Sequence, residues 1–333
     1  QVVTLPVSPV FLPLLDPSAS PVPSVVETAF DLDSFMELCR LPVTSLARLP
    51  RRLASRFAHV FSGLLLQVLE KPSDVKSHLH LQLFPKCVLA SFKDRHKLWG
   101  ATLHGRLDLW SRGDDGQQDL LAGLRDSLKP SPHVSTVPAT QTSSRRCHKL
   151  LIQGRMRDAL QALLSTGIKS VNDEVLAMLD RLHPPSKTPL VSLTLPNPAE
   201  VSPLVCSPDQ VASALASFAN GTGCGRDGLR AQHLVDMLRD PLNGNALLHQ
   251  MTRWINLLLT GEVPAVLGQF IASAPLYPLA KASGGIRPIA VGEIWRRLRF
   301  KLAARLLARP AADLLRPVQL GVAVPGGAEA IVH

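Results

Sequence analysis

The spacing of hydrophobic residues predicts helices over most of the chain. Residues 46–69 carry apolar side chains at mixed three- and four-residue steps, which is typical of a helix with one buried face. A pair of short helices is predicted over residues 154–184, with Gly167 as the break between them. The apolar stripe of the first is Met156, Leu160, Leu163 and Leu164, and that of the second is Val171, Val175, Leu179 and Leu182.

From Ser207 onward the pattern also predicts a small β-hairpin. The run 207–210 (SPDQ) combines an N-cap serine, a proline at the first helical position and a capping-box glutamine, so a helix starts here. Strands are expected over 270–279 and 286–291, with Ser283-Gly284-Gly285 as the turn and prolines that break or edge the ribbon. Further helices are expected over 229–239, 245–260 and 293–308. The expected fold class is therefore α+β and mostly helical.

Shifts in composition divide the chain into six expected segments. These are an acidic, proline-rich and disordered leader (1–38), a helical region (39–128), a linker (129–148), the helix pair (149–186), a proline-rich linker (187–206) and a final domain (207–333). No basic segment precedes the apolar start, so a signal peptide is not expected. The uncharged run 263–280 contains three prolines, so no membrane span is expected either.

Charge narrows the class of partner. The 333 residues carry 36 Lys and Arg against 26 Asp and Glu, a net charge of +10, with a pI near 9.8. Such a balance favours a polyanion, nucleic acid first. The segment 281–316 alone holds nine Lys or Arg against Glu293 and Asp313. The five cysteines form no C-x-x-C pair, which favours reduced thiols and an intracellular protein.

Two sets of cations are candidate binding residues. Lys281 ends the first predicted strand and Arg287 opens the second, so the hairpin brings an ammonium and a guanidinium fork near one tip. Together they suit a triphosphate, although two ordinary surface charges would show the same local pattern. A polar stripe on the following helix suits a nucleic-acid backbone, and a plain solvated face is the competing interpretation. Its members are Arg297, Lys301 and Arg305.

The sequence patterns for a dinucleotide site, a metal site or nucleophilic catalysis are weak. The glycine loop 221–228 follows a predicted helix and not a strand, so a helix–helix turn is favoured over a dinucleotide fingerprint. His78 and His80 lack a second pair of ligands at metal-binding spacing, and Asp114-Asp115 fits an exposed turn. No set of residues typical of nucleophilic catalysis has supporting context. We predict no catalytic residue and no metal site from these patterns.

From Cys206 onward the order of features resembles the fingers part of a reverse transcriptase domain, most closely those of non-LTR retrotransposons. The matching pieces are FANGTGCGRDGLRAQHLVDM (218–237), LLLTGEVPAVLGQFIASAPLYPLAKASGGIRPIAVGEIWRRL (257–298) and PVQLGVAVPGGAEAIVH (317–333). The resemblance covers about 130 residues, and the pairing of G-x-D-G-L with P-L-x-K and GG-x-RPI is its most specific part. The helix pair, with LDRLHPP, resembles the leader that precedes such domains.

The resemblance implies a fold, a ligand and partners. It implies a right-hand polymerase whose fingers hairpin holds the triphosphate of the incoming nucleotide through Lys281 and Arg287. A complete family enzyme uses Mg²⁺ and dNTPs, with an RNA template and a DNA primer. Its two metal ions are held by palm aspartates, one on the strand that opens the palm and a pair after Tyr-x.

This sequence departs from the family at those aspartates. Its one tyrosine, Tyr277, is followed by Pro-Leu-Ala, and Asp114-Asp115 precedes the fingers region with no tyrosine before it. The first residue is Gln. We therefore expect a fragment that is inactive alone, with the palm absent and no carboxylates to hold Mg²⁺. The alternative is a non-catalytic basic nucleic-acid-binding protein derived from a retroelement.

Overall fold

The chain folds into helices and one small sheet, arranged as two compact units. The structure, a computed structural model, describes residues 31–41, 45–90, 99–128, 139–152, 154–165, 167–184, 202–281, 283–327 and 329. The first unit comprises 1–128, 193–274 and 292–333, and the second comprises 129–192 and 275–291. The expected α+β class with a mostly helical chain is confirmed.

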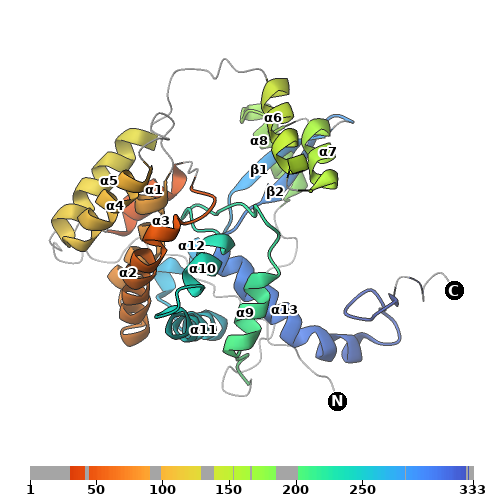
Figure 1. Cartoon of the computed structure of the whole chain (residues 1–333). Helices are drawn as coiled ribbons and strands as arrows, with labels where there is room; N and C mark the ends of the chain where they lie inside the picture. Colours follow the sequence, from red (N-terminus) through yellow and green to blue (C-terminus); the bar gives the residue numbers. More distant parts are fainter. Residues whose placement is uncertain are drawn as a thin grey trace, which may run out of the picture. The chain divides into compact units, whose positions relative to one another are not determined.

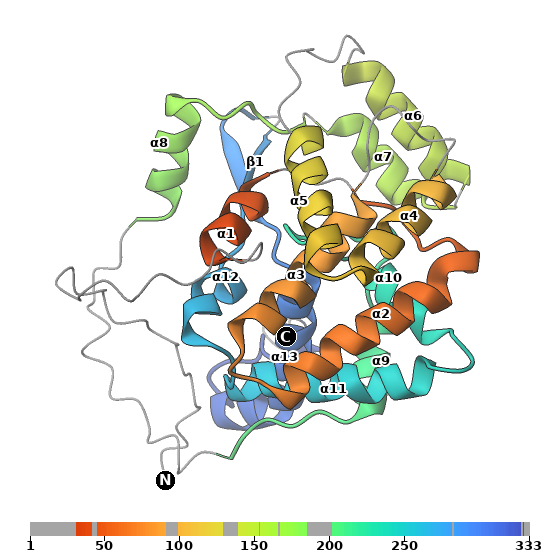
Figure 2. The ribbon, with the colours of Figure 1, turned by 90° about the vertical axis from the view of Figure 1, so that its left-hand side faces the viewer.

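The first unit is helical throughout its described residues. Helix α2 packs against α3, α4, α10 and α11, while α9 packs against α11 and α13 (Figures 1 and 2). Its elements are α1 (Leu32–Arg40), α2 (Arg51–Glu70), α3 (Val75–Leu89), α4 (Trp99–Ser111), α5 (Asp114–Leu128), α9 (Pro208–Ala216), α10 (Ala231–Leu238), α11 (Gly244–Thr260), the 3₁₀ turn η4 (Ala265–Leu267), α12 (Gly268–Ala272) and α13 (Ile294–Leu315).

Aromatic side chains join α2, α3, α11 and α13 in the core of the first unit. Phe57 and Phe84 lie 4.8 Å apart between ring centroids, and Phe61 stacks on Trp295 at 6.1 Å. Trp254 meets Trp295 edge to face. All five rings are buried. Because such rings bury large apolar areas, they carry much of the packing energy that holds distant sequence segments together.

Local signals place several helix ends where the sequence predicts them. The Ser207 hydroxyl accepts a hydrogen bond from the Gln210 backbone amide, and the Gln210 side-chain oxygen accepts one from the Ser207 backbone amide, which completes the capping box. At the far end of α11, Gly261 takes the left-handed conformation with φ of 79°. A residue with a β-carbon adopts that conformation at a cost, so glycine stops the helix there.

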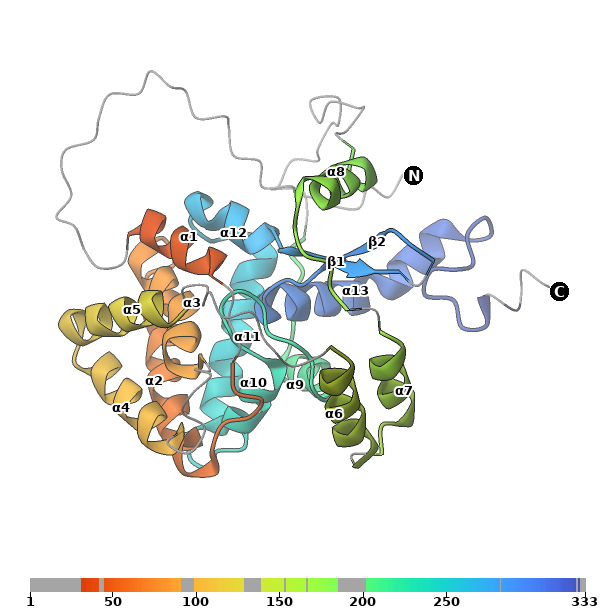
Figure 3. The ribbon, with the colours of Figure 1, turned by 90° about the horizontal axis from the view of Figure 1, so that it is seen from above.

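The second unit combines three helices with the hairpin. Its elements are α6 (Ala139–Ile152), α7 (Met156–Leu164), α8 (Asp173–Leu182), β1 (Leu276–Ala280) and β2 (Ile286–Ala290). Helices α6 and α7 lie side by side, and α8 packs against β2 (Figure 3). The Lys169 amide donates to the Pro278 carbonyl, and the Ala280 amide donates to the Gly167 carbonyl. These bonds tie the segment before α8 to the free edge of β1.

The structure divides the chain differently from the predicted segments. The hairpin, expected within the 207–333 domain, belongs to the same unit as the helix pair, because residues 167–169 bond to β1. Helix α1 begins inside the predicted leader, where the Asp31 carboxylate caps it by accepting from the Ser34 amide. Helix α6 begins inside the predicted linker at Ala139. Residues 1–30 of the leader and 185–201 between α8 and α9 lie outside the described residues.

The helix pair itself is less buried than the sequence pattern predicts, and of its second stripe only Val175 is buried. Helices α7 and α8 form where predicted, but the apolar stripe of α7 faces outward, with Met156 72% exposed. The buried residues of α7 are Ala159 and Ala162. Small residues at this position let the backbones of α6 and α7 approach closely, so the larger side chains are left outside.

No single helix in the described ranges is long and apolar enough to cross a membrane. The bent pair formed by α11 with the η4–α12 segment passes the test of length and composition only.

Candidate functional site

The strand register of the hairpin decides which side chains share a face. Leu279 pairs with Arg287 and Ala280 pairs with Ile286, and the Lys281 amide donates to the Gly285 carbonyl at 3.3 Å. Paired residues in an antiparallel ribbon point to the same side, and successive residues alternate. One face therefore carries Tyr277, Ile289, Leu279, Arg287 and Lys281. We call it the cation face.

The opposite face of the hairpin is apolar, and it is covered from its middle to its tip, whereas Leu276 and Ala290 at the inner end are exposed. Pro278 and Ile286 are buried there, and Ala280 and Pro288 are partly buried. Pro278 and Pro288 pair with each other at a position where neither nitrogen points to the other strand, so the missing N–H groups cost no bond between β1 and β2. Covering this side leaves the cation face as the open side of the hairpin.

The two residues predicted to bind a triphosphate lie on the cation face. Lys281 and Arg287 are both exposed and sit diagonally across the ribbon, a relation that puts two residues about 7–8 Å apart. Within the described part of the chain, neither side chain forms an ion pair or a hydrogen bond to a carboxylate. The hairpin thus presents an ammonium and a guanidinium that form no ion pair with the acidic side chains that the structure describes.

The three cations predicted on the following helix have partners inside the first unit. Arg297 donates to the Gly223 carbonyl at 2.6 Å, and Lys301 donates to the Ser217 carbonyl while lying 4.4 Å from the Phe218 ring centroid. Arg305 donates to the Ser217 hydroxyl at 2.9 Å. Lys301 and Arg305 thus meet the C-terminal end of α9, where the helix dipole favours positive charge. The contacts give these three side chains a packing role within the first unit. That they also bind nucleic acid remains a prediction.

The glycine loop packs closely against the start of α13. A β-carbon at Gly225 would lie 2.6 Å from the Glu293 Cα, closer than real atoms approach. The neighbouring Arg226 donates to the Glu293 carboxylate at 2.6 Å and lies 4.4 Å from the Phe270 ring centroid. This contact explains the glycine without any nucleotide, as the helix–helix turn interpretation expects.

Sequence reasoning missed the buried charges beside this loop. The Asp227 carboxylate accepts a hydrogen bond from the Leu229 amide, and its side chain is buried. Burial, and after it the neighbouring Glu293 carboxylate, raise the pKa of Asp227 to about 8. Burial likewise lowers the pKa of Lys86, which donates to the carbonyls of Leu38 and Leu41 at the end of α1. No periodic pattern marks a lone buried charge, so the sequence held no signal for it.

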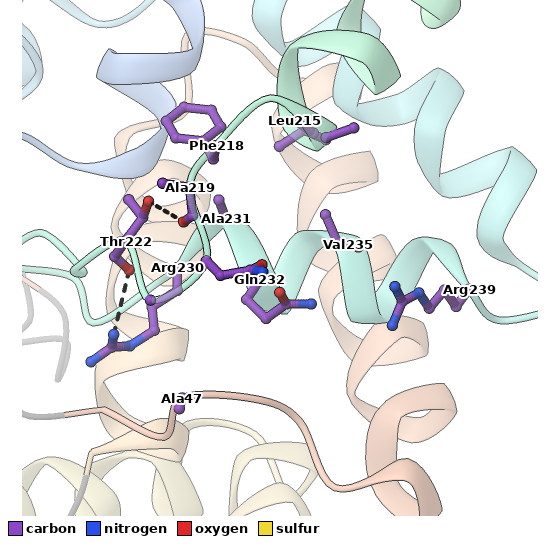
Figure 4. A pocket seen from close by; sticks show the side chains of 13 residues that line it. Ala47, Leu215, Phe218, Ala219, Thr222, Arg230, Ala231, Gln232, Val235 and Arg239 are labelled. Carbon is purple, nitrogen blue, oxygen red and sulfur yellow. Dashed lines mark hydrogen bonds between the residues drawn. The ribbon is translucent and has the colours of Figure 1, made fainter. Parts of the chain in front are cut away.

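A cavity of about 220 Å³ lies where α9 ends and α10 begins. Figure 4 shows Arg230 reaching from the start of α10 to the Thr222 carbonyl, and Phe218 and Val235 also line the cavity. Arg230 also donates to the Ser45 side chain at 3.0 Å. Arg230, one of two arginines that line the cavity, therefore holds the loop before α2 to the glycine loop.

The candidate metal residues are not brought together. His78 and His80 lie in α3, where the His78 ring contacts the Pro72 carbonyl, and Asp114-Asp115 forms the first turn of α5. Among the described residues no group of three or more His, Cys, Asp or Glu side chains is placed to hold a metal ion. The five cysteines are free, as their spacing predicts.

The site is thus defined by its geometry: an open hairpin face with two unneutralised cations and an aromatic ring. Comparison of the chain with known protein families, with curated proteins and with solved structures finds no match in any of the three.

Proposed function

We propose that the chain contains the fingers part of an RNA-directed DNA polymerase of the non-LTR retrotransposon type, and that its hairpin binds a nucleoside triphosphate. The resemblance of residues 218–333 to that domain supports the family. The observation that carries the binding role is the cation face, where Lys281 and Arg287 are exposed, adjacent and without an acidic partner among the described residues.

The chemistry of the two side chains fits a phosphate chain. The Arg287 guanidinium is a planar fork that donates two parallel hydrogen bonds to phosphate oxygens, while the Lys281 ammonium acts as a compact point charge. Charge-assisted hydrogen bonds contribute about 1.5–3 kcal/mol each. In the family, these contacts orient the triphosphate for in-line attack by a primer hydroxyl. The described residues do not supply a metal-ligand cluster, so the proposal concerns binding and orientation alone.

A double variant tests the binding role. K281A/R287A should weaken the binding of a fluorescent dATP analogue at least tenfold, because two charge-assisted contacts are removed. The matched control is Arg157→Ala, which removes an exposed arginine from α7 of the same unit. Equal affinities for the double variant and the unaltered protein would refute nucleotide binding at the hairpin.

Nucleotide incorporation is a separate expectation. The 333 residues contain no Tyr-x-Asp-Asp, so we expect no primer extension on an RNA template with Mg²⁺ and dNTPs. Incorporation above a control without protein would contradict this expectation and would show that other carboxylates hold the Mg²⁺ ions.

Non-catalytic nucleic-acid binding is the second candidate, and the distribution of charge favours it. The second unit holds eleven Lys or Arg against four Asp or Glu, a larger excess than the first unit carries. A single-stranded RNA probe distinguishes the two functions. RNA that binds strongly through Lys281 and Arg287 should be displaced by a hundredfold excess of dATP if the site is one for nucleotides. If dATP does not weaken RNA binding, the cation face binds a nucleic-acid strand and not a free nucleotide.

A further inference from the structure

Tyr277 lies on the cation face, two residues before Leu279 and four before Lys281 on the same strand. It pairs across the ribbon with Ile289, and Arg287 occupies the next row toward the tip. The side chain of Tyr277 is 42% exposed, and that of Ile289 is 37% exposed. The face therefore runs from an aromatic and apolar inner end to a doubly cationic tip.

The spacing of these rows suits one nucleotide. Successive residues on one face of a strand are about 7 Å apart, so the row of Tyr277 lies one such step from the row of Arg287. Lys281 lies one further step toward the tip. A nucleotide has the same order of parts: a flat base, a sugar and then a chain of phosphates. Its base would reach the ring when its phosphates meet the two cations.

Exposed aromatic rings beside unpaired cations are how proteins hold unpaired bases. Every base has a flat π surface that stacks on such a ring, and the nearby cations hold the attached phosphates. The covered side of the ribbon, with Pro278 and Ile286 buried, anchors the strands and keeps the ring side open.

We propose that Tyr277 is a binding residue that stacks on a nucleobase whose phosphates are held by Arg287 and Lys281. The inference rests on the proposed function and deepens it, because it names the part of the ligand that the cations do not contact. The shared ligand chemistry is a nucleobase joined to phosphate, which a free nucleotide or a single-stranded nucleic acid both supply.

The test compares dATP with inorganic tripolyphosphate, which has the phosphates but no base. Tyr277→Ala should weaken dATP binding by roughly tenfold and leave tripolyphosphate binding unchanged. Tyr277→Phe should keep dATP affinity, because the ring and not the hydroxyl makes the contact. The control is Leu276→Ala, since Leu276 is 40% exposed on the opposite face of the same strand. Loss of dATP binding in L276A equal to that in Y277A would overturn the stacking role.

A photochemical measurement removes any dependence on variant folding. Irradiation of the unaltered protein with 5-iodo-dUTP should give a cross-link that peptide mapping assigns to Tyr277. A cross-link confined to other residues would overturn the proposal.

These measurements also distinguish a free nucleotide from a single-stranded nucleic acid as the ligand, and failure of the stacking inference from failure of the proposed function. Oligo(rA) replaces dATP in one series, and the ligand whose affinity falls in Y277A is the source of the base. If K281A/R287A leaves tripolyphosphate binding intact, the proposed function fails. If that double variant loses binding but Y277A binds dATP normally, only the stacking inference fails.

Discussion

Asp227 shows how much one residue depends on its surroundings. Its carboxyl group is enclosed between the glycine loop and the start of α13, near Glu293, Arg297 and Lys86. One oxygen accepts from the Leu229 amide at 3.0 Å, while Oδ2 has no hydrogen-bond partner in the described structure. Because burial penalises the charged form, the pKa rises to about 8 and the folded protein holds a proton at neutral pH.

Asp227→Asn should remove a pH dependence of folding. The pKa of Asp227 is higher in the folded protein than in the unfolded chain, so its contribution lowers the free energy of unfolding as pH rises from about 4 to about 8. Burial lowers the pKa of His80 and of His233 to about 4, and because the unfolded pKa is about 6.5, their opposite contributions are nearly complete by about pH 7.5. Urea unfolding between about pH 7.5 and 8.5 should therefore show a falling stability whose slope is shallower in D227N.

The control for this measurement is Asp209→Asn, since Asp209 is exposed in the first turn of α9. D209N should keep the slope of the unaltered protein. If D227N kept it as well, the buried carboxyl group would not be the source.

At the residue scale, sequence reasoning located charges better than their partners. It predicted that Lys281 and Arg287 lie on one hairpin, because a glycine turn joins the two predicted strands. The observed strand register agrees with that prediction. It did not foresee that Lys301 and Arg305 bond to the end of α9, because α9 is 84 or more residues away in the chain. Contacts between distant segments leave no trace in local periodicity.

Among the elements, the glycine loop depends most on the absence of side-chain atoms. Gly225 contacts the backbone of residues 292–293, and that contact brings Arg226 to Glu293 and to the Phe270 carbonyl. The loop thereby joins α9, α12 and α13 into one packed group. A β-carbon at this position would separate the two backbones.

Gly225→Ala should lower the free energy of unfolding by about 2 kcal/mol, because the added methyl group overlaps Glu293. Gly223→Ala is the matched control in the same loop, since a β-carbon there meets nothing within 4 Å. Urea unfolding of both variants measures the difference. Equal stabilities for G225A and G223A would show that the loop moves away from α13 without cost.

Element types were more predictable than their orientation. The capping box at Ser207 and the helix stop at Gly261 follow from local chemistry, and both are observed. The predicted strand from residue 270 proves to be a short helix, α12, followed by β1 from Leu276. The outward stripe of α7 could not be foreseen, because periodicity shows which side is apolar and not whether a neighbour covers it.

At the scale of the whole molecule, charge is unevenly shared between the two units. The excess of cations in the second unit lies mainly on α6 and the hairpin, among other segments. Composition alone predicted a polyanionic partner for the chain. It did not predict the division into units, because the bonds that join residues 167–169 to β1 link segments more than 100 residues apart.

Salt should weaken RNA binding in proportion to the phosphates contacted. If about five phosphates are contacted, the logarithm of affinity falls with the logarithm of salt concentration at a slope near −4. K281E/R287E should make that slope shallower by about two, because each lost phosphate contact removes roughly one. Fluorescence anisotropy of a labelled single-stranded RNA at several KCl concentrations gives both slopes.

Arg309→Glu is the control for that series, since the Arg309 side chain is 93% exposed on α13. It should leave the slope nearly unchanged. A salt dependence close to zero for the unaltered protein would refute electrostatic binding of RNA.

The proline in β2 has a consequence for how the hairpin meets other molecules. Pro288 faces the outer edge of the ribbon and has no amide hydrogen, so at that point the edge offers no donor to an incoming strand. On its other side, β1 already bonds to residues 167–169. Pairing of a further strand with either edge of the hairpin is therefore disfavoured. Another molecule would contact the hairpin through its side chains, and not by adding a strand to the sheet as in a fibril.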